Sequence, residues 1–176
     1  MAINCSLNKD LLRSNTCAYS LPEVVTIYLA NFGDVTTSVG VDSAGCESIS
    51  AITMATGATF YKIEPAKNSA SFTDELVVED NGNKHRTHTL TFNVTGKYDE
   101  CMKPVFDALS LGKYFAVVYT ADGTYLALGR LTGVEAETAT LAGGGDSNGI
   151  SIVLSANVTE SVTPLTGTAI TTVTGA

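Results

Sequence analysis

Two histidines lie close together in the segment DELVVEDNGNKHRTH, residues 74–88. His85 and His88 are three residues apart in a predicted strand, and alternation puts them on opposite faces. They therefore cannot hold one metal ion between them, as two histidines on one face of a helix can. We expect both to be exposed on a hairpin.

Other features that could carry chemistry give weaker signals. Glu75, Glu79 and Asp80 could perform acid–base work or bind calcium, but no calcium-loop spacing is present and a solvated charge group explains them. Cys46, in DSAGCES, follows a glycine but has no signature of a nucleophile around it. The glycine-rich loop AGGGDSNG (142–149) lacks the Lys-Ser/Thr ending of a phosphate loop. The sequence predicts no catalytic, cofactor-binding or metal-binding residues, and no enzyme.

The four cysteines, Cys5, Cys17, Cys46 and Cys101, include no C-x-x-C pair. We expect buried or half-buried thiols in a protein folded in a reducing cytoplasm. The alternative is a Cys5–Cys17 disulfide that ties down the N-terminal segment.

The composition limits the classes of partner. The chain has 176 residues and a net charge of −8, and its few Lys and Arg residues are scattered singly. Attractive binding to nucleic acid is not expected, because it needs clustered positive charge; an acidic surface instead avoids sticking to a polyanion. The first residues have no apolar run typical of a signal peptide, and the most apolar stretch, 24–32, is too short to cross a membrane.

Alternation of apolar residues predicts many short strands. Residues 24–32 are apolar on both faces, which is typical of a central strand, and a weaker strand follows in VTTSVGV. Residues 47–63 are predicted to form a hairpin that turns at Thr56-Gly57. Residues 114–131 form another, with its turn at Asp122-Gly123.

One segment has helical spacing, and the tail has little pattern. A helix is expected over 99–111, with Asp99 as its N-cap and Gly112 as its C-terminal stop. The Thr-rich tail, LTGTAITTVTGA, could be a last strand or a mobile extension.

These elements predict a mainly β fold. We expect an antiparallel β-sandwich or barrel with one flanking α-helix, about 99–111, and a long projecting hairpin. The domain spans residues 23–160, with the hairpin arm at 70–94. An N-terminal arm, 1–22, precedes it, and a C-terminal extension, 161–176, follows it.

The hairpin arm is the candidate functional site. Its apolar face fades toward the turn at Asn81-Gly82, so its base can pack on a core while its tip projects. A projecting tip with charges of both signs gains nothing from its own core, but it can gain from a neighbouring subunit. The predicted inter-subunit residues are Leu76, Val78, Glu79, Asp80, Lys84, Arg86, His88 and Leu90.

Three runs carry a resemblance to a known family: VVTIYLANFGDVTTSV, then ATFYKIEPAKNSASFTDELVVEDNGNKHRTHTLTFNV, then AVVYTADGTYLALGRLTGVEAETAT with GGGDSNGISIVLSANVTE. They resemble structural proteins of tailed bacteriophages of gut Bacteroidetes, more particularly tail tube proteins. The resemblance spans Val24–Glu160 and rests on the order of elements. It implies hexameric rings that stack into a tube, a sheet lining the channel, an outer helix, and an arm, Leu76–Leu90, that reaches the next ring. The tubes of type VI secretion systems have a similar fold.

The resemblance also implies partners and a location. The chain would assemble with copies of itself and with tape measure, terminator and baseplate proteins, while genomic DNA passes through without specific binding. It would be built in the bacterial host cytoplasm and reside in the virion tail, with no cofactor and no membrane. Two alternatives stay open. One is another phage structural protein of similar fold, such as a tail terminator, head–tail connector or decoration protein; the other is a β-sandwich adhesion or receptor-binding module.

Overall fold

The computed structural model describes residues 23–144 and 149–175. The predicted N-terminal arm, the Cys5–Cys17 alternative and the middle of the glycine-rich loop lie outside these residues. In chain order, the elements are β1 (Val24–Asn31), the 3-10 turn η1 (Phe32–Asp34), β2 (Val35–Val41), β3 (Glu47–Met54), β4 (Tyr61–Ile63), β5 (Ser71–Val78), β6 (Lys84–Val94), α1 (Met102–Leu111), β7 (Lys113–Thr120), β8 (Tyr125–Leu128), β9 (Val134–Ala142), β10 (Gly149–Val158), β11 (Thr163–Pro164) and α2 (Thr168–Thr174).

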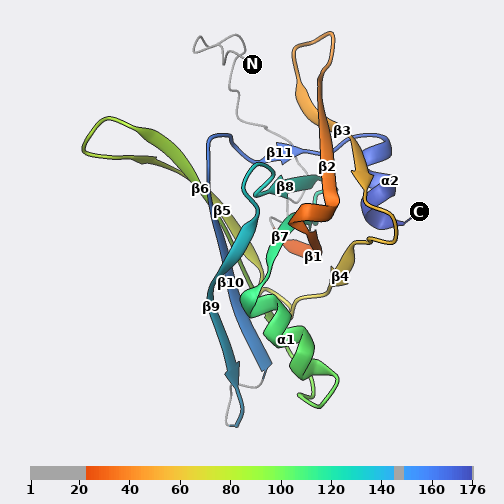
Figure 1. Cartoon of the computed structure of the whole chain (residues 1–176), viewed down its shortest axis with the longest axis vertical. Coiled ribbons are helices and arrows are strands. Elements are labelled where there is room, and N and C mark those ends of the chain that lie inside the picture. The colour runs from red at the N-terminus through yellow and green to blue at the C-terminus, as the bar shows by residue number, and fades with distance from the viewer. Residues whose placement is uncertain (1–22, 145–148, 176) are drawn as a thin grey trace, which may run out of the picture.

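The fold is mainly β and antiparallel, as predicted. One bent sheet runs in the order β11-β8-β7-β9-β10-β6-β5, and β1 joins it by pairing with β7 on one side and β4 on the other. The prediction of a central first strand is therefore confirmed. A separate two-stranded sheet pairs β2 with β3. In Figure 1 the β5–β6 hairpin reaches away from the body on the side opposite α2.

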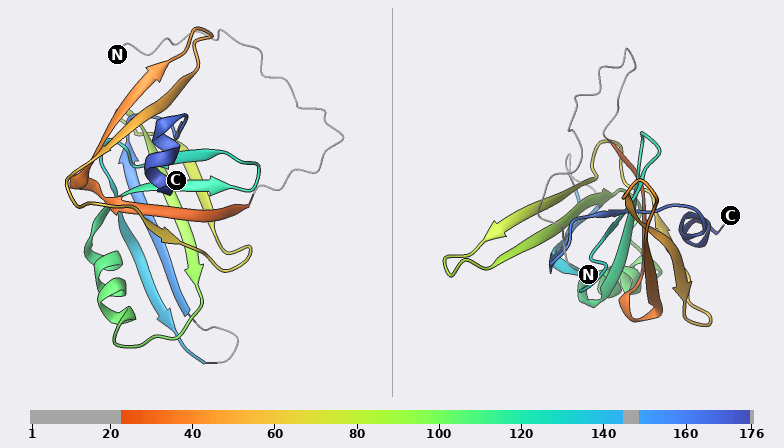
Figure 2. Two further views of the ribbon diagram at one scale, coloured as in Figure 1. Left: turned by 90° about the vertical axis from the view of Figure 1, so that its right-hand side faces the viewer. Right: turned by 90° about the horizontal axis from the view of Figure 1, so that it is seen from above.

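Strand β7 is buried on both faces and separates two cores. Its Tyr114, Ala116 and Val118 face a core shared with β1, β6 and β10. Its Phe115 and Val117 face a second core built with β3, β8 and α2. Figure 2 shows α2 and the β2–β3 hairpin on one side of the β1–β7–β8 layer. Alternation along β7 therefore holds three layers together.

Helix α1 begins three residues later than predicted. Its first turn starts at Met102, and the Asp99 carboxylate accepts the N–H groups of Cys101 and Met102, at 3.1 Å each, just ahead of it. Asp99 thus caps the helix from outside its first turn. The predicted stop at Gly112 is confirmed, because its N–H donates to the Ala108 carbonyl and the chain then enters β7.

The predicted hairpin over residues 47–63 is wrong. The turn at Gly57 does form, but β3 pairs with β2, and β4 instead pairs with β1 through Ile27 and Ile63. The β2–β3 turn is closed by Asp42, whose carboxylate accepts the N–H groups of Ala44 and Cys46 at 2.8 Å. An aspartate turn of this kind fixes the pairing locally.

The Thr-rich tail folds against the body, where it follows β11 and forms α2, a second helix that the sequence pattern did not predict. Ala169 and Val173 lie one helical turn apart and are buried in the second core. The hydroxyl of Thr168 donates to the Ser50 carbonyl at 2.9 Å. Burial of one face, rather than helix propensity, explains this helix.

The expectation of buried thiols is wrong for the two cysteines in the described residues. Cys46 and Cys101 are both exposed. Cys46 lies at the end of the β2–β3 turn and Cys101 in the turn before α1, where the chain runs along the surface.

Candidate functional site

The predicted arm is the β5–β6 hairpin. Its strands pair from Ser71–Thr91 to Val78–Lys84, whereas β10 pairs with β6 only as far as Arg86. Residues 77–85 therefore extend beyond the rest of the sheet. The turn closes with the Gly82 N–H donating to the Glu79 carbonyl at 2.9 Å, and Gly82 has a φ of 84°. This is a short hairpin loop that needs a glycine at its left-handed position.

The eight predicted arm residues separate into surface and core positions. Leu76 and Val78 are 52% and 57% exposed. Glu79, Asp80 and Lys84 are also exposed, and Arg86 is half-buried. His88 and Leu90, at 1% and 0% exposure, lie in the core. Only the first six are placed where a partner could reach them.

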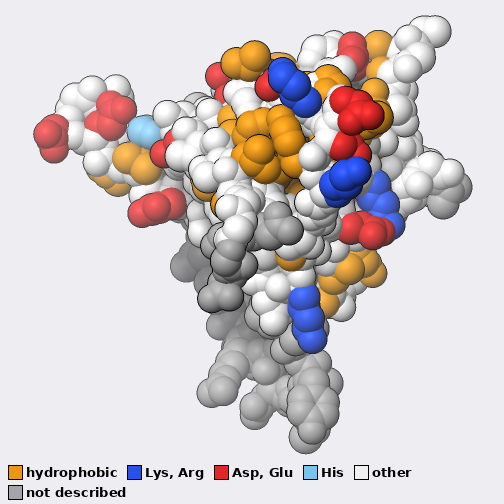
Figure 3. All heavy atoms as spheres, turned by 90° about the horizontal axis from the view of Figure 1, so that it is seen from below, with side chains coloured by type: hydrophobic (Ala, Val, Ile, Leu, Met, Phe, Trp, Pro, Cys, Tyr) orange, Lys and Arg blue, Asp and Glu red, His pale blue; other side chains and the backbone are white. Residues whose placement is uncertain are grey.

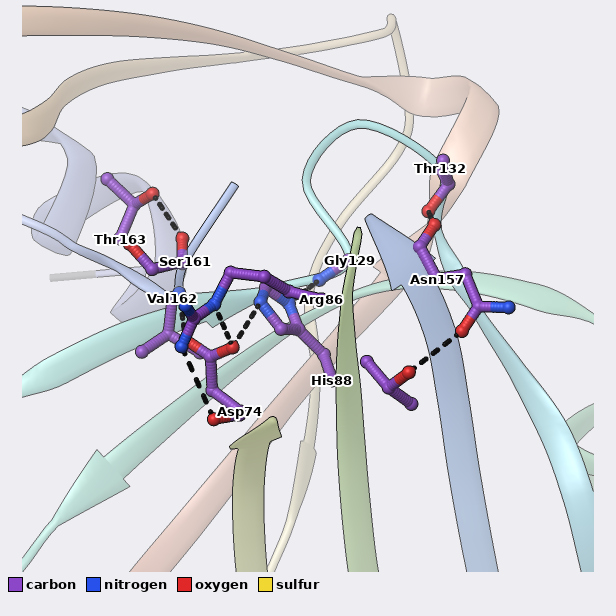
Figure 4. Close-up of polar contacts among 10 residues, drawn as sticks. Asp74, Arg86, His88, Gly129, Thr132, Asn157, Ser161, Val162 and Thr163 are labelled. Atoms are coloured by element: carbon purple, nitrogen blue, oxygen red, sulfur yellow. Dashed lines mark hydrogen bonds and ion pairs between the residues drawn. The ribbon is translucent and has the colours of Figure 1, made fainter. Parts of the chain in front are cut away.

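The expectation of an exposed His88 is wrong, because its ring is buried in a polar cluster; Nδ1 accepts a hydrogen bond there, whereas Nε2 makes none among the described residues. Figure 4 shows the Asp74 carboxylate between three partners. One oxygen accepts Arg86 Nε at 2.6 Å and lies 3.5 Å from His88 Nε2; the other accepts the N–H of Val162 at 3.0 Å. The N–H of Gly129 donates to His88 Nδ1 at 3.2 Å. The cluster joins the base of the arm to the β8–β9 bend and to the chain before β11.

Burial and charge shift two pKa values in this cluster. Burial alone would raise the pKa of Asp74, but the bonds from Arg86 and Val162 outweigh it and hold that pKa below its usual range. Burial lowers the pKa of His88, although Asp74 and Glu160 act against it. His88 is therefore neutral at pH 7, with Nδ1 as acceptor and the proton on Nε2, toward Asp74.

This arrangement is structural rather than catalytic. Both ring nitrogens of His88 face protein groups, and the ring is closed off from solvent. A general base needs a nitrogen that can reach a substrate proton. Beside the cluster, Arg130 and Glu160 form a second half-buried ion pair, with Nε and Oε1 2.8 Å apart. The Asp74 cluster ties the base of the hairpin to the body, and the Arg130–Glu160 pair joins two segments of the body beside it.

The outward face of the β5–β6–β10–β9 sheet is polar, and the positive charge beside it comes from Lys113 of β7, whose Nζ lies 2.8 Å from Glu135. Alternation places its residues opposite the buried side chains of β6 and β10. No Lys or Arg from these four strands points outward, since Lys84 and Arg86 lie on the core side. The outward residues are Ser71, Thr73, Glu75, Val77, His85, Thr87, Thr89, Thr91, Asn93, Ser151, Val153, Ser155, Asn157, Glu135, Thr138 and Thr140. His85 is thus on the opposite face from His88, as alternation predicts.

The same four strands end in two open edges. Within the described residues, β5 pairs only with β6, and β9 meets β7 only at Val134 and Glu135. All of β5 is therefore an open edge, and residues 137–142 of β9 have no described strand partner on the side away from β10, although α1 packs close to β9. Open edges of this length are a template for pairing with another chain.

Within the described chain no three His, Cys, Asp or Glu side chains gather where a metal ion could be held. None of the helices in residues 23–144 and 149–175 has the length and hydropathy needed to span a bilayer. Comparison with known protein families, with curated proteins and with solved structures found no match.

Proposed function

We propose that this chain is the subunit of a self-assembling tube, of the kind that the resemblance to phage tail tube proteins implies. Copies join edge to edge into a ring, rings stack, and DNA passes through the bore of the resulting virion tail. The observation that carries this proposal is a sheet with two open edges and one outward face of hydroxyl and acidic side chains.

The strand directions suit closure into a ring. Neighbouring strands in the order β5-β6-β10-β9 alternate in direction, so β9 runs antiparallel to β5. A rotated copy that places its β5 beside β9 of its neighbour continues the antiparallel pattern. Repeated around an axis, this contact removes every open edge of the four-stranded sheet. Six copies would close about 24 strands, more than the 16–18 that already leave an aqueous channel in porins.

The outward face suits the inner wall of such a ring. Its hydroxyl and amide groups are compatible with water, and Glu75 supplies negative charge, while the charge of Glu135 is paired with that of Lys113. DNA binds proteins largely by exchanging counterions for Lys and Arg. These four strands add no outward Lys or Arg, and the neighbouring Lys113 is already paired with Glu135, so a polyanion can slide along the wall without adhering.

The first test is the assembly state of the purified chain. Size-exclusion chromatography and negative-stain imaging over a range of concentrations should show rings or tubes. A particle that stays monomeric at every concentration would overturn the proposal and favour a β-sandwich binding module.

Hydrogen exchange tests the edge contact itself. Assembly should slow exchange of amides in β5 and in residues 137–142, which are open edges in the single subunit. Amides of β7, which is paired along both sides, serve as the internal control and should change little. Rings that form without new protection in β5 and β9 would contradict edge-to-edge pairing.

A further inference from the structure

An apolar cavity of about 630 Å³ opens between α1, β4 and the end of the sheet farthest from the arm's tip. Tyr61 and Val105 are 61% and 48% exposed and stand at its rim. Figure 3 views this end of the molecule and shows hydrophobic side chains gathered in a patch with charged side chains beside it. Its lining includes Met102, Val105, Leu109, Tyr61, Phe92 and Ile152.

The tip of the arm carries an exposed aliphatic pair. Leu76 and Val78 share one face of β5, and neither belongs to the side chains that pack on the two cores of the described residues. They follow Asp74 along β5, and from Leu76 onward the β5 side chains on the core side of the sheet are exposed. The fold of the single chain therefore does not stabilise this pair by burial.

The tip cannot reach the cavity of its own chain. The cavity includes Phe92 and Val94 at one end of β6, and the tip begins at Lys84 at the other end. At the usual rise along a strand, these ends are about 33 Å apart. A contact between tip and cavity must therefore join two copies of the chain, head to tail.

We propose that Leu76 and Val78 of one copy dock into the α1–β4 cavity of a second copy. This inference rests on the proposed tube and identifies the contact that stacks one ring on the next. The interface is heterologous, and between stacked rings such a contact can repeat along the tube axis. The open edges of β5 and β9 act within a ring, and the tip and cavity act between rings.

The contact brings together charges of both signs. The tip carries Glu79, Asp80 and Lys84, while Lys62 and Glu64 line the cavity and Lys103 lies in the first turn of α1 beside it. These lysines already pair with Glu64 and Asp107 in the single chain. The complementary charges thus contribute to orientation and association rate more than to affinity.

Two aliphatic side chains bury much less surface than a stable pairwise interface requires. One tip in one cavity therefore does not hold two free subunits together. A ring presents all of its tips and cavities at once, and such multivalent contact raises the overall affinity without any new interaction. The same contact is thus weak between free subunits and strong between rings.

Thiol crosslinking between two variants tests the contact. Both are built in a chain whose four cysteines are replaced by serine; one then carries Val78→Cys and the other Val105→Cys. A short thiol-specific crosslinker is added to each variant alone and to their mixture, and the same samples are imaged. We expect a crosslinked dimer in the mixture and none in either variant alone.

Each other outcome contradicts a defined part of the reasoning. Rings or tubes without the mixed dimer would overturn the tip–cavity contact and leave the proposed function standing. Crosslinking of the Val78→Cys variant with itself would replace it with a tip-to-tip contact. Single subunits without crosslinks at every concentration would overturn the tube and this contact together.

A second pair of variants keeps the native cysteines. Leu76→Ser with Val78→Ser should leave the melting temperature within about 2 °C, because both side chains are exposed, and should reduce stacking at least tenfold. The matched control is Val41→Ser, at an equally exposed valine on the β2–β3 hairpin, and it should stack normally. Normal stacking of the Leu76/Val78 variant, or loss of stacking in the control, would refute the assignment.

Discussion

Replacing Asp74 with asparagine should cost the fold about 2–3 kcal/mol. Asp74 is 11% exposed and its carboxylate accepts Arg86 Nε at 2.6 Å and the Val162 N–H at 3.0 Å. Hydrogen bonds to a charged group contribute about 1.5–3 kcal/mol each. Asparagine has the same size but one acceptor oxygen, so it keeps one bond, loses the other, and leaves the half-buried guanidinium of Arg86 without a countercharge.

The assay is thermal and urea denaturation at pH 7.5, at a concentration where the protein is monomeric. For a chain of this length, 1 kcal/mol shifts the melting temperature by about 2–4 °C, so the variant should melt roughly 4–12 °C lower. The matched control is Glu75→Gln. Glu75 is adjacent but exposed on the outward face, and its change should stay within about 0.5 kcal/mol.

A double-mutant cycle shows whether the loss comes from the pair itself. Arg86→Met should destabilise the wild type, and it should cost at least 1 kcal/mol less when Asp74 is already asparagine. Equal effects of the Asp74 and Glu75 changes would refute the reasoning, and so would additive effects of the Asp74 and Arg86 changes. Either result would mean that the cluster does not hold the arm.

Three further predictions concern acid, the tail and the bore. The pKa of His88 is depressed below 6.5 and that of Asp74 below 3.8, so on acidification the unfolded chain takes up each proton before the folded chain does. The free energy of unfolding should therefore fall as the pH drops below about 6.5 and again below about 3.8. His88→Gln should remove the first of these two decreases in urea titrations. Val173→Ala should cost about 2 kcal/mol in thermal melts, because Val173 is 3% exposed; a change near zero would mean that α2 is not part of the core. Tubes carrying Glu75→Lys and Glu135→Lys should retain DNA at low salt and release it at high salt, whereas retention equal to that of wild-type tubes would exclude this face from the bore.

Local signals in the sequence were sufficient to predict most of the helices and strands. Residues 24–32, apolar on both faces, contain the predicted central strand β1, with Ile27 and Leu29 buried. Asp122-Gly123 marks the turn between β7 and β8, and Gly123 has the positive φ that this turn needs. Such signals depend only on near neighbours, so a single chain reveals them.

Local signals could not predict which strands pair with each other. The segment from Glu47 is flanked by two turn signals, at Asp42 and at Gly57, and either could close a hairpin. The choice depends on the second core, where Ile49 and Ile52 meet Leu165 from more than a hundred residues away. The sequence pattern missed the helix of the tail for the same reason. Threonine disfavours helices, and only the tertiary packing of Ala169 and Val173 compensates for this.

The burial of His88 could have been predicted from the sequence. Alternation already placed Asp74 and His88 on the core face, and the hairpin register puts them directly opposite each other. A carboxylate across from an imidazole offers a buried partner. The missing signal was Gly129, whose N–H donates to Nδ1 of the ring and which comes from a bend about 40 residues away.

Under the proposed assembly, the division of the arm into a polar base and an apolar tip has a mechanical reason. A flexible arm loses conformational freedom when it docks, and that loss subtracts from the affinity of a small contact. The Asp74–Arg86–His88 cluster fixes the base of the hairpin before docking. Asp74→Asn should therefore weaken stacking of rings even though it leaves Leu76 and Val78 unchanged, whereas Glu75→Gln should not. Stacking that is unaffected by Asp74→Asn would separate the stability of the cluster from the function of the arm.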